Sequence, residues 1–280
     1  MKRLAQGIDV SHWQDGPDED GDGRPDSDLI DRDLLLAHPP DFFIWRVGDG
    51  QDLDREAWHH MDVALALELA HGTPWGVYHY LRGRRSIGLH TDVLDEALDG
   101  VRPPLGVWLD IEGDPDAESR RHRGSYLDSN PEEVLSLALN YEATLTARGY
   151  PVGVYGNWGL RELPKGQRLD RLARLPLWIP DYAADDGEPG EERRTKWGPR
   201  TPGLPHPWEK WTIHQITGRG SWAGVGTAVD INVWNGDTLD LAAWVTRHGP
   251  SCEDLSTEDL TPAQRLEDLE RRVSALEAKQ

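Results

Sequence analysis

Short apolar segments alternate with longer segments of helical periodicity along most of the chain. The short segments are rich in β-branched and aromatic residues, which is typical of strands buried on both faces. Eight such segments occur, at residues 7–10, 42–47, 75–80, 106–112, 152–155, 177–179, 211–215 and 229–233. The hydrophobic pattern therefore predicts eight buried strands.

Helices are predicted between the earlier strands. Residues 54–71 carry apolar side chains at helical spacing before Gly72, and Asn130-Pro131 begins a second helix that ends near residue 148. Beyond residue 176 no helical segment is predicted, and loops rich in glycine, proline and charged residues take over. Strand–helix alternation favours a parallel sheet, so the sequence predicts an α/β fold, an irregular TIM-like (β/α)5(β)3 barrel that loses its helices in the second half.

The C-terminal tail differs from the barrel. Residues 250–262 are polar and acidic, as in a linker, and residues 263–280 repeat Leu266, Leu269, Val273 and Leu276 at coiled-coil spacing. The expected organisation is a catalytic barrel at 1–249, a linker at 250–262 and a short coiled-coil-like helix at 263–280. Homo-oligomerisation through this helix and a solvated amphipathic helix both remain open.

Composition excludes several classes of protein. The 280 residues carry a formal charge of −20 and a pI near 4.8, which argues against nucleic acid as a partner. No apolar run approaches the ~20 residues that span a bilayer, so we expect no membrane insertion. The N-terminus lacks the apolar region of a signal peptide. The single cysteine, Cys252, excludes an internal disulfide.

Four acids are expected at the C-terminal ends of predicted strands: Asp9, Asp110, Glu112 and Asp230. Barrel enzymes place their chemistry at the C-terminal ends of strands, and the first and last strands of a closed barrel are neighbours. Gathered carboxylates repel, so at least one pKa should rise and leave a protonated acid beside ionised partners. Glycoside hydrolysis uses this combination. Helix caps, salt bridges and a metal site are the alternatives, although no histidine ligand spacing accompanies the acids.

Four motifs occur in the order found in one enzyme family. Gly7-Ile8-Asp9-Val10-Ser11-His12-Trp13-Gln14, Gly76 to Tyr80, Leu109 to Glu112, and Val229 to Gly236 resemble the glycoside hydrolase family 25 lysozymes. These are the Chalaropsis-type N-acetylmuramidases found among phage endolysins. The resemblance covers residues 6–245 and implies a flattened, incomplete barrel.

The resemblance also implies roles for individual residues. Glu112 would be the general acid/base, Asp110 would orient the substrate N-acetyl group or stabilise the transition state, and Asp9 and Asp230 would line the same acidic hole. Tyr78 and Tyr182 match sugar-contacting tyrosines. The implied reaction cleaves the β-1,4 bond between N-acetylmuramic acid and N-acetylglucosamine in bacterial peptidoglycan, with retention and without a catalytic cofactor. An endolysin without a signal would accumulate in the host cytoplasm and act on the wall after release.

Tryptophan is unusually frequent, with 13 residues against two phenylalanines. Indole faces stack on sugars, so Trp13 and Trp234 are predicted to line the cleft, as is Trp158. One departure from the family is His214-Gln215, where Trp-Gln is usual; we interpret His214 as a packed or hydrogen-bonded side chain.

An acidic insertion follows the first motif. Asp18, Asp20, Asp22 and Asp26, with Gly23 at position six, match the start of a calcium loop, but position twelve is Leu29 rather than a bidentate glutamate. A structural calcium ion and a solvated acidic loop both remain open.

Two other functions are alternatives to the muramidase. One is a chitinase-like barrel glycosidase, which would need a longer DxxDxDxE strand, and the other is a non-catalytic glycan-binding virion protein.

Overall fold

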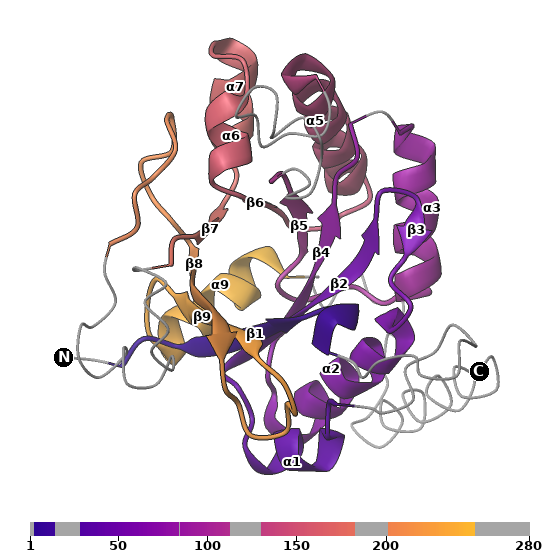
Figure 1. Cartoon of the computed structure of the whole chain (residues 1–280), viewed down its shortest axis with the longest axis vertical. Coiled ribbons are helices and arrows are strands. Elements are labelled where there is room, and N and C mark those ends of the chain that lie inside the picture. Colours follow the sequence, from indigo (N-terminus) through magenta and orange to yellow (C-terminus); the bar gives the residue numbers. More distant parts are fainter. Residues whose placement is uncertain (1–2, 15–28, 84, 113–129, 183–200, 250–280) are drawn as a thin grey trace. The chain divides into compact units, whose positions relative to one another are not determined.

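The eight predicted strands are confirmed and close into a barrel in the computed structural model (Figure 1). The structure describes residues 3–14, 29–83, 85–112, 130–182 and 201–249, and the chain divides into two units at Gly249. The barrel strands are β1 (Gln6–Val10), β2 (Phe42–Asp49), β4 (Trp75–Tyr80), β5 (Val107–Asp110), β6 (Val152–Tyr155), β7 (Leu177–Pro180), β8 (Ile213–Gly220) and β9 (Val229–Trp234). A two-residue strand, β3 (Asp52–Leu53), pairs with the end of β2.

The closing strand runs against the others. Strands β1, β2 and β4 to β8 are parallel, whereas β9 is antiparallel to both of its neighbours, β8 and β1. Asp230 therefore does not lie at a C-terminal strand end, as the sequence argument assumed. It is the second residue of β9, and the reversed direction brings it opposite Asp9 at the barrel mouth.

Helices follow most of the parallel strands. They are α1 (Arg32–Ala37), α2 (Ala57–His71), α3 (Ile87–Leu98), α5 (Pro131–Ala147), α6 (Trp158–Glu162), α7 (Gln167–Leu172) and α9 (Thr238–His248), with a 3-10 turn at His12–Gln14. The two predicted helices are confirmed as α2 and α5. Across the described ranges, every helix is too short or too polar to span a bilayer.

Helix α9, which follows the last strand, contradicts the prediction that no helical segment occurs beyond residue 176. The Asp237 side chain accepts hydrogen bonds from the backbone of Leu239 and Asp240, while the Asp240 carboxylate accepts from the Asp237 N–H, which forms a capping box. Its apolar stripe, centred on the buried Leu241, packs into the core cluster at the barrel floor. The helix has only 11 residues and its Leu239 is exposed, so its apolar stripe is hard to recognise in the sequence.

Alternation along the strands divides the side chains between two layers. Inward positions carry Ile44, Trp108, Tyr155, Trp178 and Ile213, which form one buried cluster inside the barrel. Outward positions pack beneath the helices. The inward row ends at the mouth in polar side chains, and those side chains form the site described next.

Candidate active site

The structure brings the four predicted acids together at the mouth of the barrel. Asp9 and Asp110 are each 2% exposed, and Asp9 lies directly opposite Asp230 in the β1–β9 pair. Glu112 is half-buried two residues beyond Asp110. Burial raises the pKa of both Asp110 and Asp230, and the charges of Glu112 and Asp9 add to the effect on each of them.

The backbone that carries Glu112 is held on both sides. Leu81 N–H donates to Asp110 O at 3.0 Å, and Ile111 N–H donates to Tyr155 O at 2.9 Å. The turn into α6 packs so closely that a Cβ on Gly159 would lie 2.4 Å from Ile111 O and 3.0 Å from Glu112 Cα. Only glycine fits there, so the start of α6 fixes the position of Glu112.

Asp9 is a buried carboxylate with a complete set of donors. Asn232 Nδ2 donates to its Oδ2 at 2.7 Å, Gln215 Nε2 donates at 2.9 Å, and a carboxyl–carboxyl hydrogen bond joins it to Asp230. Burial raises the pKa of Asp9 to about 6 against the effect of these three bonds. Burial and the neighbouring Asp9 raise the pKa of Asp230 well above its ordinary value. Asp230 therefore holds a proton that it donates to Asp9.

Two amides that sequence reasoning did not select hold this pair in place. Gln215 Oε1 accepts from the hydroxyls of Tyr155 at 2.8 Å and Tyr182 at 2.7 Å, which turns its Nε2 toward Asp9. Asn232 Oδ1 accepts from Trp178 Nε1 at 2.8 Å, which turns its Nδ2 the same way. Gln215 and Asn232 could have been identified from the sequence, because they occupy inward positions on strands next to the acids.

Asp110 has a different environment. Burial raises the pKa of Asp110 well above its ordinary value, Glu112 adds to the effect, and the Arg46 charge opposes it. Its Oδ1 is buried and makes no hydrogen bond to the part of the chain that the structure describes. A buried oxygen without a partner is costly, and here it is available to a ligand at the mouth.

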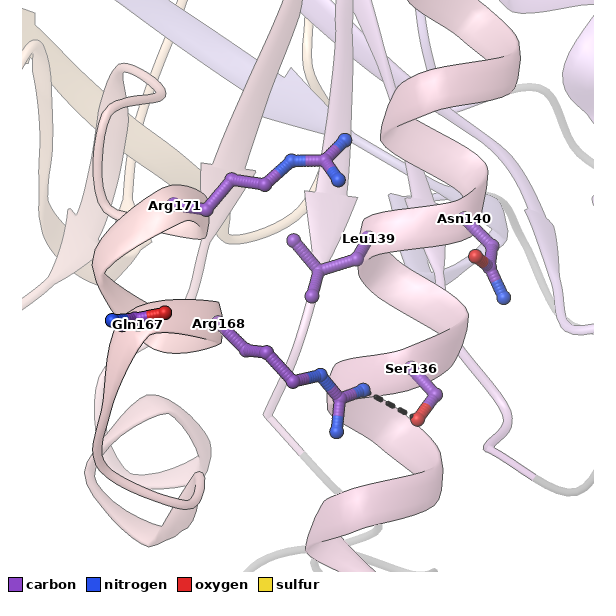
Figure 2. A pocket seen from close by; sticks show the side chains of 6 residues that line it. All are labelled: Ser136, Leu139, Asn140, Gln167, Arg168 and Arg171. Atoms are coloured by element: carbon purple, nitrogen blue, oxygen red, sulfur yellow. Dashed lines mark hydrogen bonds between the residues drawn. The ribbon is translucent and has the colours of Figure 1, made fainter.

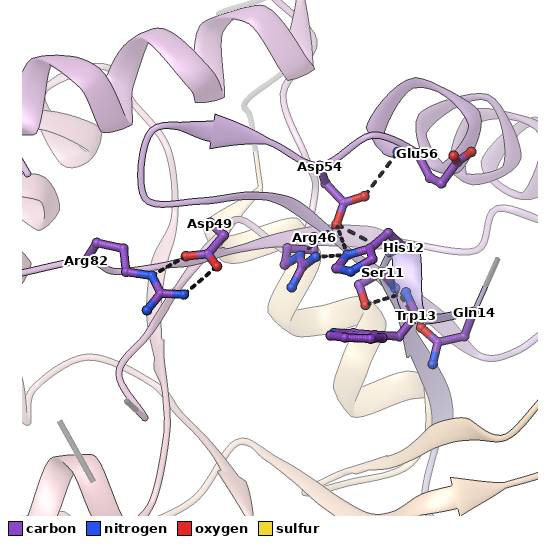
Figure 3. Close-up of polar contacts among 9 residues, drawn as sticks. All are labelled: Ser11, His12, Trp13, Gln14, Arg46, Asp49, Asp54, Glu56 and Arg82. Carbon is purple, nitrogen blue, oxygen red and sulfur yellow. Dashed lines mark hydrogen bonds and ion pairs between the residues drawn. The ribbon is translucent and has the colours of Figure 1, made fainter. Parts of the chain in front are cut away.

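A buried ion pair supports the β1 side of the mouth (Figure 3). Arg46 Nε donates to Asp54 Oδ2 at 2.6 Å, and Arg46 Nη2 contacts His12 Nδ1. Burial acts to raise the pKa of Asp54, but hydrogen bonding to His12 and the Arg46 charge outweigh it and hold that pKa below its ordinary value. Arg46 and Asp54 were not predicted from the sequence, because neither belongs to a motif that contains one of the four acids.

Aromatic side chains flank the acids. Tyr78 is the β4 partner of Arg46, and burial together with three nearby acids raises its pKa well above the ordinary value. Tyr182 is 41% exposed while its hydroxyl reaches Gln215. Trp13 is 73% exposed and stacks on His12 with ring centroids 4.5 Å apart, and Trp158 is 56% exposed at the start of α6.

Trp234 does not fit the predicted sugar contact. It is 4% exposed and packs edge-on against Phe42 and Trp244, with ring centroids 6.3 Å and 5.4 Å away. It follows Asp230 by four residues on an antiparallel strand, about 13 Å, so it lies at the floor rather than at the mouth.

The remaining predictions concern metals and His214. The predicted calcium ligands Asp18, Asp20, Asp22 and Asp26 lie outside the described residues, as does the heptad helix at 263–280. Among the residues that are described, no group of three or more His, Cys, Asp or Glu side chains could hold a metal ion. His214 Nε2 donates to Asp181 O at 2.9 Å, so it is hydrogen-bonded within the fold.

A second concavity lies between α5 and α7 (Figure 2). Its arginines are already paired: Arg168 contacts Glu132 and Ser136, and Arg171 contacts Glu142. It contains none of the acids at the mouth and offers no group for hydrolysis. The barrel mouth is therefore the better candidate.

Comparison with known proteins defines the class of fold. No family model and no curated protein matches the sequence. Solved structures do match. Lysozyme from Streptomyces coelicolor is 19% identical with a TM-score of 0.62, over 88% of this chain and 99% of that one. A family 25 glycosyl hydrolase from Bacillus anthracis is 17% identical with a TM-score of 0.62, over 87% and 94%.

A phage enzyme is similar in the same way. The catalytic domain of an endolysin from bacteriophage P40 of Listeria monocytogenes is 17% identical, with a TM-score of 0.55 over 85% of this chain and 97% of that one. The chain thus has the barrel fold of the family 25 glycosyl hydrolases. The fold that the sequence motifs predicted is confirmed.

Proposed function

We propose that the chain is a peptidoglycan hydrolase, a muramidase that cleaves the β-1,4 bond between N-acetylmuramic acid and N-acetylglucosamine. The observation that carries the proposal is the cluster of four carboxyl groups at one mouth, three of them with raised pKa values. Similarity to a lysozyme, a family 25 hydrolase and a phage endolysin supports the choice of bond and substrate.

In the proposed mechanism Glu112 gives its proton to the leaving glycosidic oxygen as the bond to the anomeric carbon breaks. It then takes a proton from the water that bonds to that carbon from the same face. Its half-buried position leaves it open to the mouth, and the Gly159 contact fixes its backbone. Asp110 Oδ1, which has no hydrogen-bond partner among the described residues, accepts the N–H of the substrate acetamido group, and the ionised form of Asp110 stabilises positive charge as the bond breaks. Asp9 and Asp230 carry a shared charge beside them and stabilise the same transition state.

The proposed cleft takes sugar rings on its aromatic walls. Trp13 and Trp158 expose indole faces, and Tyr182 and Tyr78 offer ring edges and hydroxyls near the acids. Aromatic faces match the apolar faces of sugars, while hydroxyls and amides match their polar rims. This arrangement suits a neutral glycan backbone.

We further propose that hydrolysis retains the anomeric configuration and that the protein is a phage endolysin, made in the host cytoplasm and acting on the wall after release. The retaining outcome rests on the family resemblance. Proton NMR of a fresh digest tests it, because the first product anomer should be β. An initial α anomer would contradict retention while leaving the substrate assignment intact.

The direct test compares Glu112→Gln with Glu133→Gln on purified bacterial walls. Glu133 is an exposed acid on α5, so its variant is a matched control. Removal of a general acid should lower the initial rate of wall solubilisation at least about 100-fold, with no change for the control. Equal rates for Glu112→Gln and wild type would overturn the proposed role.

A further inference from the structure

Another pocket, of about 460 Å3 and distinct from the concavity between α5 and α7, lies on the outer surface of the barrel. It is lined by the N-terminal segment, β1, the turn after α1, and the β8–β9 hairpin, with Arg3, Gln6, His38, Pro39, Trp222 and Ile231 among its residues. Gln6 and Ile231 occupy outward positions of β1 and β9, whereas Asp9 and Asp230 point inward. The pocket is therefore separated from the acidic mouth by the barrel wall.

Gln6 is the most informative residue in this pocket. It is only 7% exposed, and its backbone N–H and C=O are both paired with Asp41, at 2.7 Å each. Its side-chain amide makes no hydrogen bond in the described part of the chain, although it lines the pocket. Because this amide has no partner within the described part of the chain and lines the pocket, its donor and its acceptor are available to a ligand.

The other lining groups define the ligand. Trp222 is half-buried, and its Nε1 donates to His38 O at 2.9 Å, which fixes the indole at the pocket wall. Arg3 is paired with Asp41 at 2.5 Å, so the pocket holds no free cation among its described groups and does not favour an anion. Ile231 adds an apolar floor. A neutral ring with one apolar face and an amide-bearing edge fits these groups.

We propose that this pocket binds an N-acetylhexosamine unit of a peptidoglycan glycan strand, as a saccharide site separate from the acidic mouth. The proposal rests on the muramidase function proposed above for the substrate class. The acetamido group pairs with the Gln6 amide, and the sugar face packs on Trp222. A chain of charge −20 gains no long-range attraction to an anionic wall, so a second short-range contact strengthens its attachment.

The test follows tryptophan indole N–H signals by NMR in the full chain carrying Glu112→Gln, with the N-acetylglucosamine tetramer as the probe. Trp222→Phe assigns the Trp222 signal, and Trp13 and Trp158 report on the mouth. The Trp222 signal should shift saturably. Gln6→Met removes the amide at similar volume and should weaken binding at Trp222 about fivefold or more, without lowering the melting temperature.

Trp58→Phe is the matched control, because Trp58 is also half-buried and donates its Nε1 to a backbone carbonyl, that of Glu96. It should leave the Trp222 titration unchanged. A Trp222 signal that does not move, or that moves equally in Gln6→Met, would overturn the pocket. Shifts at Trp13 and Trp158 alone would overturn the pocket while supporting the proposed function. Shifts at Trp222 alone would support saccharide binding in the pocket and count against glycan binding at the mouth.

Discussion

At the scale of single residues, the mouth depends on neutral amides as much as on its acids. Asn232 is fully buried and links Trp178 to Asp9, and Gln215 links two tyrosines to the same carboxylate. Each amide is oriented on one side by a donor and presents its N–H groups on the other. Burial raises the pKa of Asp9, and the hydrogen bonds from these two amides offset part of that increase.

Substitution of Asn232 tests this role. Asn232→Ala removes one donor from Asp9 and leaves Trp178 Nε1 unpaired, so the free energy of unfolding should fall by about 1–3 kcal/mol in urea titrations. The pKa of Asp9 should rise further above about 6, as measured by carbon NMR of its carboxyl group. Asn140→Ala, at an exposed site on α5, should change stability by less than about 0.5 kcal/mol. An unchanged Asp9 titration would contradict the account.

The ion pair of Arg46 and Asp54 should stabilise the fold in a pH-dependent way. Asp54→Asn leaves the Arg46 charge buried without its partner and should cost about 3 kcal/mol at pH 7. The pKa of Asp54 is depressed in the folded state, so its stabilisation is complete above the ordinary value of 3.8 and is lost as the pH falls through the folded value. The difference in unfolding free energy between wild type and variant should therefore shrink below about pH 4. A difference that is independent of pH would contradict this.

Motifs in the sequence could select the four acids because each lies within or beside an apolar strand. Gln215, Arg46 and Asp54 could not be selected in that way. Their roles depend on which strands become neighbours, and an amide or an ion pair leaves no local pattern. Trp234 was misplaced for a related reason, because only the direction of β9 decides which end of the strand reaches the mouth.

At the scale of elements, the strands were predictable and one helix was not. Residues such as Phe42 to Val47 form an apolar run that only a buried strand explains. Helix α9 has a single fully buried side chain, Leu241, so its apolar stripe is weak in the sequence. Its capping box at Asp237 and Asp240 was the available signal.

A histidine between the barrel and its helices should make the stability of the fold depend on pH. His79, on β4, is fully buried; its Nε2 donates to Gly50 O at 2.8 Å, and its Nδ1 lies 3.0 Å from the Tyr141 hydroxyl oxygen. Burial lowers its pKa to about 3 from 6.5, and the nearby His90 adds to the effect. The unfolded chain therefore binds a proton that the folded chain excludes between these values.

Stability should consequently fall as the pH drops from about 6.5 toward 3. His79→Gln removes this contribution, so the slope of unfolding free energy against pH in that range should decrease by up to about 1.4 kcal/mol per pH unit relative to wild type. Chemical denaturation at several pH values measures the slope. Equal slopes for wild type and His79→Gln would show that His79 is not held neutral.

At the scale of the whole molecule, the charge of −20 affects the proposed action on bacterial walls. Bacterial walls that carry phosphate polymers are anionic and repel the chain at long range. Raising the salt concentration from about 10 mM to about 150 mM shortens the screening length from about 30 Å to about 8 Å. The initial rate of wall solubilisation should therefore increase with salt over this range, while binding of the neutral N-acetylglucosamine tetramer should not change. A wall rate that falls with salt would contradict the account.

We propose that the acidic mouth cleaves the muramyl bond of peptidoglycan. The most direct test is borohydride reduction of a wall digest, followed by identification of the reduced sugar at the new chain ends. Digestion by the wild type should give muramitol ends, and digestion by Glu112→Gln should give none above background. Glucosaminitol ends, or muramitol ends at the same level from Glu112→Gln, would contradict the proposal.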